Sequence, residues 1–199
     1  MKFQVLHKAS LLILLVVLLT TSCGEKTFNL DRYDNKKVIF VKKLVESPLL
    51  EYVIAVPNEW NINIKPASDE NFSNSKLITT SAEDRNGFKK TVSIFKLPKD
   101  EKQNNLQDAI KSIRSGIMDK YSFYEASEIK ETELFGSKTL YIDNELHNES
   151  GRAALAVDGV FESPDGNIYH VRLLAPPSET QKKTLAMLIQ IVNTMKFKA

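Results

Sequence analysis

Apolar and polar residues alternate along much of the chain after residue 37, which is the pattern of β-strands. The alternating stretches are separated by short segments rich in Gly, Pro, Asn and Asp, which favour turns. In the segment 83–87, Asn86-Gly87 predicts the turn of a β-hairpin. The predicted strands are 38–45, 51–56, 61–65, 76–81, 90–97, 124–133, 137–147, 152–163 and 167–175.

The period of the apolar residues becomes helical in two places, over 104–120 and again after Pro176-Pro177. Gly116 lies inside the first predicted helix, where glycine costs about 1 kcal/mol relative to Ala, and we interpret it as a sign of close approach to the sheet. The apolar stripes are Leu106, Ile110, Ile113, Ile117 and Tyr121 in the first helix and Leu185, Leu188, Ile189, Val192 and Met195 in the second.

The order of these elements predicts the fold class. Strands, a helix, more strands and a closing helix are typical of an α+β protein in which helices flank an antiparallel sheet. No internal repeat or second shift in composition interrupts residues 38–199, so we expect one domain there.

The first 22 residues predict export. Lys2, His7 and Lys8 form a basic start, and residues 11–19 are all Leu, Ile or Val. At about 1.5 Å per residue this run spans about 14 Å as a helix, well short of the ~30 Å hydrocarbon core of a bilayer. We therefore interpret residues 1–22 as a signal peptide.

The signal ends in Leu19-Thr20-Thr21-Ser22-Cys23, which resembles the lipobox of bacterial lipoproteins. The resemblance implies cleavage between Ser22 and Cys23, a diacylglyceryl thioether on Cys23 and, often, acylation of the freed amine. An ordinary secretory signal is the alternative. Because each buried methylene contributes about 0.8 kcal/mol, two or three acyl chains would hold the protein on a membrane.

Residues 23–37 are predicted to form the lipidated N-terminus and a flexible tether, because they are polar and lack periodicity. A flexible tether of this length has a root-mean-square span of about 20 Å. Gly24 follows the lipidated position, where enterobacterial lipoproteins retained in the inner membrane usually carry Asp. By that resemblance the expected location is the cell envelope, on the outer membrane if the organism has two.

Composition excludes several classes of function. One Cys and three His leave no set for a zinc ribbon or a disulfide scaffold, and we expect no metal and no cofactor. Without Lys2 and Lys8 the 27 basic residues become 25, equal to the 25 acidic residues, which argues against a nucleic-acid partner. The chain lacks a Gly-rich phosphate loop, His-Glu-x-x-His and Gly-x-Ser-x-Gly, so we do not expect an enzyme.

Residues 51–60 read Glu-Tyr-Val-Ile-Ala-Val-Pro-Asn-Glu-Trp, and the late part of the chain runs from Phe135-Gly136 through two long strands to a helix. This layout resembles the PsbP-like α/β/α sandwich and, within it, the DcrB-like bacterial lipoproteins. The resemblance implies a protein that acts by binding and carries no shared catalytic motif. Trp60 matches the family's Trp, and we interpret it as a core aromatic.

The last three strands are predicted to form a meander. Pairing His147 with Arg152 would place Tyr141 opposite Asp158, and pairing Ser163 with Asn167 would place Asp158 opposite Arg172. These registers predict one apolar face, comprising Leu140, Ile142, Leu146, Leu155, Val157, Phe161, Tyr169, Val171 and Leu173. The opposite, polar face is the candidate binding face and comprises Tyr141, Asp143, Glu145, His147, Arg152, Asp158, His170 and Arg172.

Two interpretations of this polar face remain open. Arg152 and Arg172 could grip a carboxylate of a ligand, or the face could be solvated and laced by cross-strand ion pairs.

Three functions follow from the sequence. The first is a lipid-anchored envelope protein that binds an unidentified envelope protein without turnover. The second is a lipoprotein that carries a small ligand in a pocket of at least ~300 Å³ between helix and sheet. The third is a hydrolase that uses Asp143, His147 and His170.

Overall fold

The computed structural model describes residues 42–65, 76–83, 88–98, 105–120, 126–134, 137–147, 153–178 and 180–198. The signal peptide, Cys23 and the tether lie outside these residues, as do Arg152 and the predicted turns at 84–87 and 135–136.

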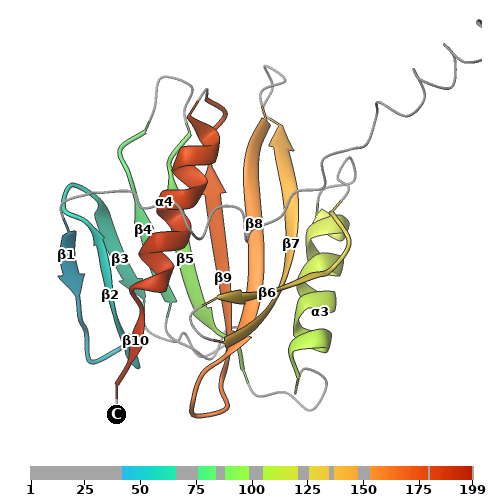
Figure 1. Ribbon diagram of the computed structural model, residues 1–199, viewed down its shortest axis with the longest axis horizontal. Coiled ribbons are helices and arrows are strands. Elements are labelled where there is room, and N and C mark those ends of the chain that lie inside the picture. Colours follow the sequence, from blue (N-terminus) through green and yellow to red (C-terminus); the bar gives the residue numbers. More distant parts are fainter. Residues whose placement is uncertain are drawn as a thin grey trace, which may run out of the picture.

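Seven antiparallel strands form the large sheet at the centre of Figure 1, in the order β3-β4-β5-β9-β8-β7-β6. The α+β prediction with an antiparallel sheet is therefore confirmed. The strands are β3 (Asn61–Lys65), β4 (Lys76–Thr80), β5 (Thr91–Lys96), β6 (Lys130–Leu134), β7 (Ser137–His147), β8 (Ala153–Glu162) and β9 (Ile168–Ala175).

Three more strands form a small second sheet in the order β1-β2-β10. They are β1 (Lys42–Val45), β2 (Tyr52–Pro57) and β10 (Lys196–Phe197). The sequence did not predict β10, because two residues are too few to show an alternation. Trp60, directly after the turn that follows β2, is buried in the core as expected.

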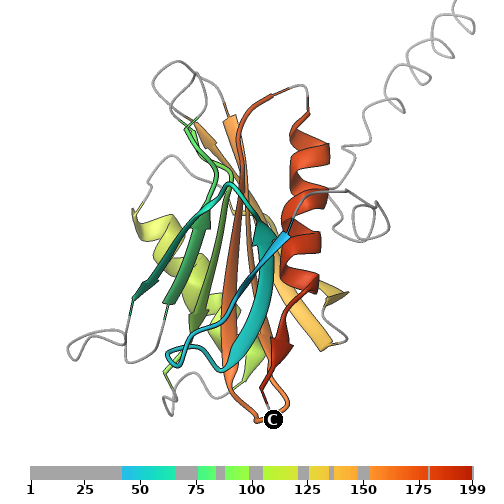
Figure 2. The same cartoon turned by 90° about the vertical axis from the view of Figure 1, so that its left-hand side faces the viewer.

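Two helices lie on opposite faces of the large sheet, α3 (Leu106–Lys120) and α4 (Gln181–Asn193). Figure 2 shows the sheet nearly edge-on between them, with the small sheet on the α4 side. The apolar stripe of α4, which includes Leu185, Leu188 and Val192, is fully buried against the large sheet. Each such side chain contributes about 1.5–3 kcal/mol of hydrophobic stabilisation. We call the face of the sheet that packs against α4 the α4 side and the opposite face the α3 side.

Helix α3 covers only part of the face of the large sheet on which it lies. Ala109, Ile110 and Ile117 of α3 are buried with Leu140 of β7 and Val160 of β8. Beyond these two strands the face is less well covered. Along β4 and β9, the residues that point to the α3 side are half-buried, whereas the alternate residues, which point to the α4 side, are buried. The large sheet therefore has one closed face and one partly open face.

A carboxylate joins the two sheets near the start of β2. Glu51 forms an ion pair with Lys96 of β5, and its Oε2 accepts a hydrogen bond of 2.6 Å from the hydroxyl of Tyr169 in β9. These two hydrogen bonds, Lys96 first and Tyr169 second, hold the pKa of Glu51 below its ordinary value. The same carboxylate, together with burial as the larger cause, raises the pKa of Tyr169.

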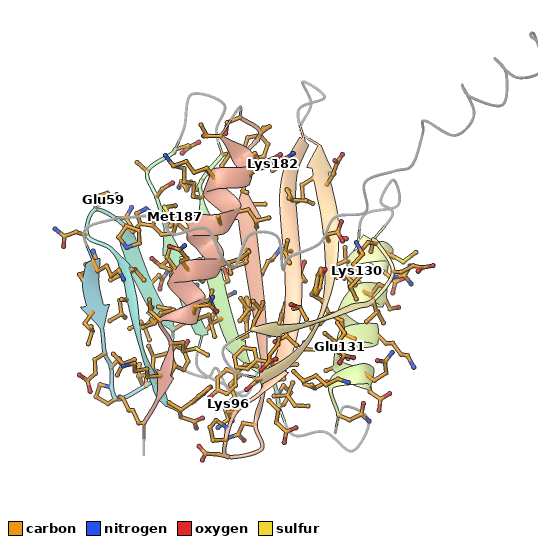
Figure 3. The ribbon with its side chains drawn as sticks, viewed as in Figure 1. Glu59, Lys96, Lys130, Glu131, Lys182 and Met187 are labelled. Atoms are coloured by element: carbon orange, nitrogen blue, oxygen red, sulfur yellow. The ribbon has the colours of Figure 1, made fainter. Side chains whose placement is uncertain are left out.

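We expect Glu51→Gln to make the protein less sensitive to acid. Because the folded pKa of Glu51 lies below the unfolded value, its contribution is present above about pH 5 and is lost as the pH falls through the folded pKa. The carboxylate is half-exposed, so the loss at pH 7 should be about 1 kcal/mol. Urea unfolding at pH 7 and pH 3 measures this, with the exposed Glu59→Gln as control (Figure 3). An equal loss at both pH values would contradict the assignment.

Gly116 does not mark a close approach to the sheet, and that prediction was wrong. It lies on the exposed side of α3, and a Cβ built there meets no atom within 4 Å. Gly116→Ala should therefore raise the free energy of unfolding by about 1 kcal/mol, the difference in helix propensity. Thermal unfolding checks this, and a decrease in the melting temperature would show that the helix is constrained there.

Candidate functional site

The strand register decides which predicted site residues can meet. Asp158 pairs with Arg172 and Val160 with His170, as predicted for β8 and β9. The predicted register of β7 and β8 was wrong by one residue, because Ile142, and not Tyr141, pairs with Asp158. Helices cover both faces of these two strands, so apolar residues occur on both sides and the alternation does not distinguish the two registers.

The corrected register divides the candidate binding face between the two sides of the sheet. Asp158, His170 and Arg172 lie on the α3 side, whereas Tyr141, Asp143 and Glu145 lie on the α4 side. The predicted apolar face divides in the same way, since Leu140 and Ile142 pack with α3 but Val157 and Phe161 belong to the core beneath α4. The eight residues therefore do not form one surface.

Three members of the predicted polar face, Tyr141, Asp143 and Glu145, do not join Asp158, and the structure describes only the backbone of His147. Tyr141 is a core residue, with 2% of its surface exposed. Asp143 forms an ion pair of 2.6 Å with Lys130 of β6. The backbone of His147 pairs with Ala153 at the end of β7. Glu145 is exposed near that end.

On the α3 side, a buried carboxylate collects polar side chains from three strands. Asp158 is completely buried, and its Oδ1 lies 2.8 Å from Nε2 of His170 and 3.7 Å from Nε of Arg172. Its Oδ2 accepts a hydrogen bond of 3.3 Å from the side-chain amide of Asn144 in β7. We call Asn144, Asp158, His170 and Arg172 the Asp158 cluster. The sequence predicted three of its members but not Asn144, because of the wrong register.

The Asp158 cluster continues toward the open part of the face. The ring of Phe95 in β5 stacks on His170, with 5.2 Å between centroids and 18° between planes. Nζ of Lys76 in β4 lies 4.4 Å from the centroid of the Phe95 ring, a cation–π contact. Burial, and after it the positive charge of Lys65, hold the pKa of Lys76 below its ordinary value. The sequence missed Lys76 and Phe95 because it did not reveal that β5 lies beside β9.

The three residues of the hydrolase hypothesis are not brought together. Asp143 lies on the α4 side and His170 on the α3 side. Leu140 of β7 lies in the same cross-strand row as His170, because both pair with Val160. His147 is seven residues further along β7, a distance of about 23 Å. A catalytic triad of these residues is therefore excluded.

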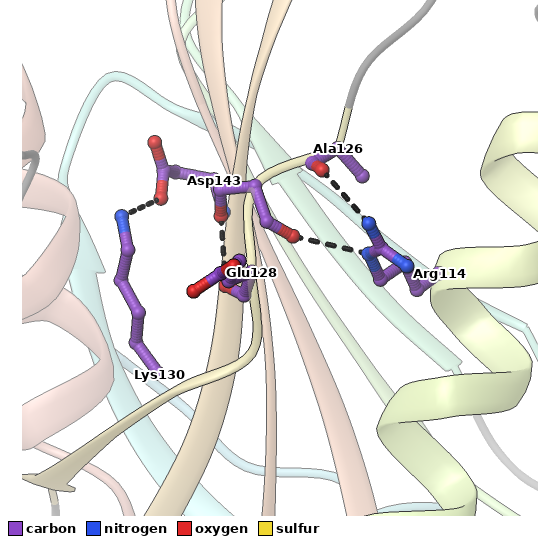
Figure 4. Close-up of polar contacts among 6 residues, drawn as sticks. Arg114, Ala126, Glu128, Lys130 and Asp143 are labelled. Atoms are coloured by element: carbon purple, nitrogen blue, oxygen red, sulfur yellow. Dashed lines mark hydrogen bonds and ion pairs between the residues drawn. The ribbon is translucent and has the colours of Figure 1, made fainter.

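Asp143 has a structural role that Figure 4 shows. Its backbone N–H donates to Oγ of Ser127 and its carbonyl accepts from the N–H of Ser127, at 2.9 and 3.1 Å. Arg114 of α3 donates to the carbonyls of Ser127 and Ala126. These bonds hold residues 126–129 between α3 and β7, which is why the strand predicted from residue 124 starts only at Lys130.

The hollow between α4 and the sheet is too small for the small-ligand hypothesis. Its volume is about 20 Å³, room for about one water molecule, whereas the hypothesis required at least ~300 Å³. Its walls include Tyr141 and Phe161 from the sheet and Ile189 and Val192 from α4.

Within the described ranges, no three His, Cys, Asp or Glu side chains gather in a way that could hold a metal ion. Among the same residues, no helix is both long enough and apolar enough to span a bilayer.

Comparison with solved structures identifies the fold. The chain is similar to cyanobacterial PsbP (CyanoP) from Synechocystis, with a TM-score of 0.54 and 12% sequence identity over 89% of this chain and 98% of that chain. The described domain has a PsbP-like fold. The resemblance inferred from residues 51–60 and from the order of elements is thus confirmed for the fold, which is all that 12% identity can show.

Two further solved structures are similar to the chain at lower TM-scores. LpqN of Mycobacterium tuberculosis, which is involved in cell envelope biogenesis, has a TM-score of 0.44 and 13% identity over 87% of this chain and 99% of that chain. A protein of unknown function from Pseudomonas aeruginosa has a TM-score of 0.42 and 12% identity over 79% and 98%. Neither a protein-family model nor a curated protein matches the chain.

Proposed function

We propose that this protein is a lipid-anchored component of a bacterial cell envelope and that its PsbP-like domain binds a partner protein without catalysing a reaction. The observation that carries the anchor is the sequence Leu19-Thr20-Thr21-Ser22-Cys23, which begins at the last residue of the apolar run 11–19. A signal that ends in this way supplies a cysteine for a diacylglyceryl group at the position where the mature chain begins.

The binding role is supported by the partly open face of the sheet. A surface of half-buried aromatic and charged side chains is suited to contact with another protein, whereas a small molecule needs a concave site. Lys76, Phe95, His170 and Arg172 provide such a surface, and the Asp158 carboxylate holds two of them in place. The hydrolase alternative has no assembled triad, and the hollow beneath α4, the place where the small-ligand alternative expects a pocket, has a volume of about 20 Å³.

Chemical crosslinking in intact envelopes tests the binding role. The protein should form a defined crosslinked species that decreases when Arg172→Ala is introduced and persists with Lys182→Ala, a change on α4 at the other side of the sheet (Figure 3). A crosslinked species that is unaffected by Arg172→Ala would place the partner elsewhere, and the absence of any species would contradict the binding role.

The location is part of the proposal. Gly24, in place of the Asp that retains enterobacterial lipoproteins in the inner membrane, favours the outer membrane in an organism with two membranes. Separation of the membranes on a sucrose gradient tests this, and recovery in the inner-membrane fraction would contradict it.

A further inference from the structure

The α3 side of four strands carries positive charge without an exposed acid. In the register of β3, β4, β5 and β9, Lys65, Lys76, Phe95 and His170 form one row across the strands, and Arg172 lies in the next row beside Ser93. These four strands contribute no Asp or Glu to this side. We call Lys65, Lys76, His170 and Arg172 the basic face.

Asp158 of β8 offsets only part of this charge. It is completely buried and contacts His170 and Arg172, whereas Lys65 and Lys76 lie on β3 and β4, at least three strands from β8. The side chain of Arg172 is 30% exposed. Its contact with Asp158 is through Nε at 3.7 Å, which is longer than a hydrogen bond.

The positive charge of Lys76 also lies beside groups that do not offset it. Its ammonium group lies over the Phe95 ring, its partial burial costs hydration, and its charged neighbour is another lysine, Lys65. An anion bound at this point would relieve the repulsion between Lys65 and Lys76.

The spacing of the charges indicates the kind of anion. Lys76 and Arg172 are separated by two strand spacings and by one row of two residues, so their Cα atoms lie about 12 Å apart. Two carboxylates four residues apart on an extended chain are about 13 Å apart, with the side chain midway between them on the same side. That side chain would meet Phe95, which is half-buried between the two cations.

We propose that the basic face binds an acidic segment of a partner protein, with one carboxylate at Lys76, one at Arg172 and an apolar side chain against Phe95. This inference rests on the proposed binding role and names the chemistry of the partner. It does not depend on the lipid anchor, which is tested separately at Cys23.

A labelled peptide tests the proposal. The probe is fluorescein-labelled Glu-Ser-Val-Ser-Glu-Ser-Val-Ser-Glu, titrated with the full-length protein purified in a non-ionic detergent, and the control peptide has Gln in place of every Glu. Fluorescence anisotropy should show binding of the acidic peptide only, weakening as salt is added. Lys76→Gln with Arg172→Gln should weaken binding by about tenfold or more.

The matched control removes the same charge elsewhere. Lys182→Gln with Lys183→Gln changes two exposed lysines at the start of α4, on the opposite side of the sheet, and should alter binding by less than about twofold. Because Arg172 contacts a buried carboxylate, the pair Lys65→Gln and Lys76→Gln provides a second test that leaves the Asp158 cluster intact, and it should also weaken binding.

Three results would overturn the proposal. The first is that the acidic peptide does not bind the unmodified protein. The second is that the α4 control variant loses as much affinity for the peptide as the Lys76→Gln, Arg172→Gln variant. The third is that inorganic phosphate or glycerol phosphate binds more tightly than the peptide. The last result would indicate a phosphate or lipid headgroup site. If the peptide test fails but a crosslinked partner is still found in intact envelopes, the proposed binding role holds and the partner binds at another surface.

Discussion

Cys23→Ser should move the protein from the membrane fraction to the soluble fraction. The hydroxyl of serine cannot form the thioether, so the chain would lose the diacylglyceryl group that the lipobox predicts. At about 0.8 kcal/mol per buried methylene, two acyl chains keep a protein on a bilayer almost permanently, and a variant without them has only the apolar run 11–19 for attachment. Membrane fractionation of cells followed by immunoblotting measures the change.

A conservative change nearby is the control. Ser22→Ala keeps a small side chain before the cysteine and should leave the protein in the membrane fraction. If the Cys23→Ser protein stays in the membrane fraction after a wash at high salt, the anchor is not the lipid on Cys23.

Asp158→Ala should be among the most destabilising single substitutions in the described part of the chain. The change removes a completely buried acceptor and leaves His170, Arg172 and the amide of Asn144 without it. Leaving buried donors without their acceptor costs about 1–3 kcal/mol, and more where a charged group is involved, so we expect a loss of about 3 kcal/mol. Urea unfolding followed by circular dichroism measures the loss.

Two further variants make this result interpretable. Asp165→Ala removes an exposed acid in the turn between β8 and β9 and should change the free energy of unfolding by less than about 0.5 kcal/mol. Asp158→Asn keeps the volume and an acceptor but removes the charge, so its loss should lie between those of the two alanine variants. A loss below about 1 kcal/mol for Asp158→Ala would show that the carboxylate does not organise the cluster.

The sequence predicted one register of the meander correctly because a turn determines it. Pro164-Asp165-Gly166 joins β8 and β9, and Gly166 adopts φ +70°, a conformation that suits glycine. Ser163 and Asn167 close this turn with a backbone hydrogen bond, which places Asp158 opposite Arg172. The pairing of two long strands then follows from three turn residues.

The register of β7 and β8 could not be obtained in the same way. The sequence of residues 148–152 contains no turn signal as specific as Pro-Asp-Gly. Ile142 and Val157 are both fully or almost fully buried, although they face opposite sides of the sheet. Where both sides of a sheet are covered, hydrophobic alternation no longer distinguishes inside from outside. This is why Tyr141, Asp143 and Glu145 were assigned to the face of Asp158.

Phe95 and Lys76 lie beside the Asp158 cluster because of strand pairings between segments that are far apart in the sequence. Phe95 meets His170 because β5 lies beside β9, and no local pattern near residue 95 indicates this pairing. Lys76 joins them only through the β4–β5 hairpin. The sequence therefore identified the polar residues Asp158, His170 and Arg172, but the sheet order was needed to extend them into the basic face.

Intact-mass analysis of the mature protein, extracted from membranes, tests the lipid anchor on Cys23. The mature chain should begin at Cys23 and carry at least one diacylglyceryl group, so its mass should exceed that of residues 23–199 by the mass of the lipid. A mass equal to that of an unmodified chain, or a chain that begins at any residue other than Cys23, would contradict it.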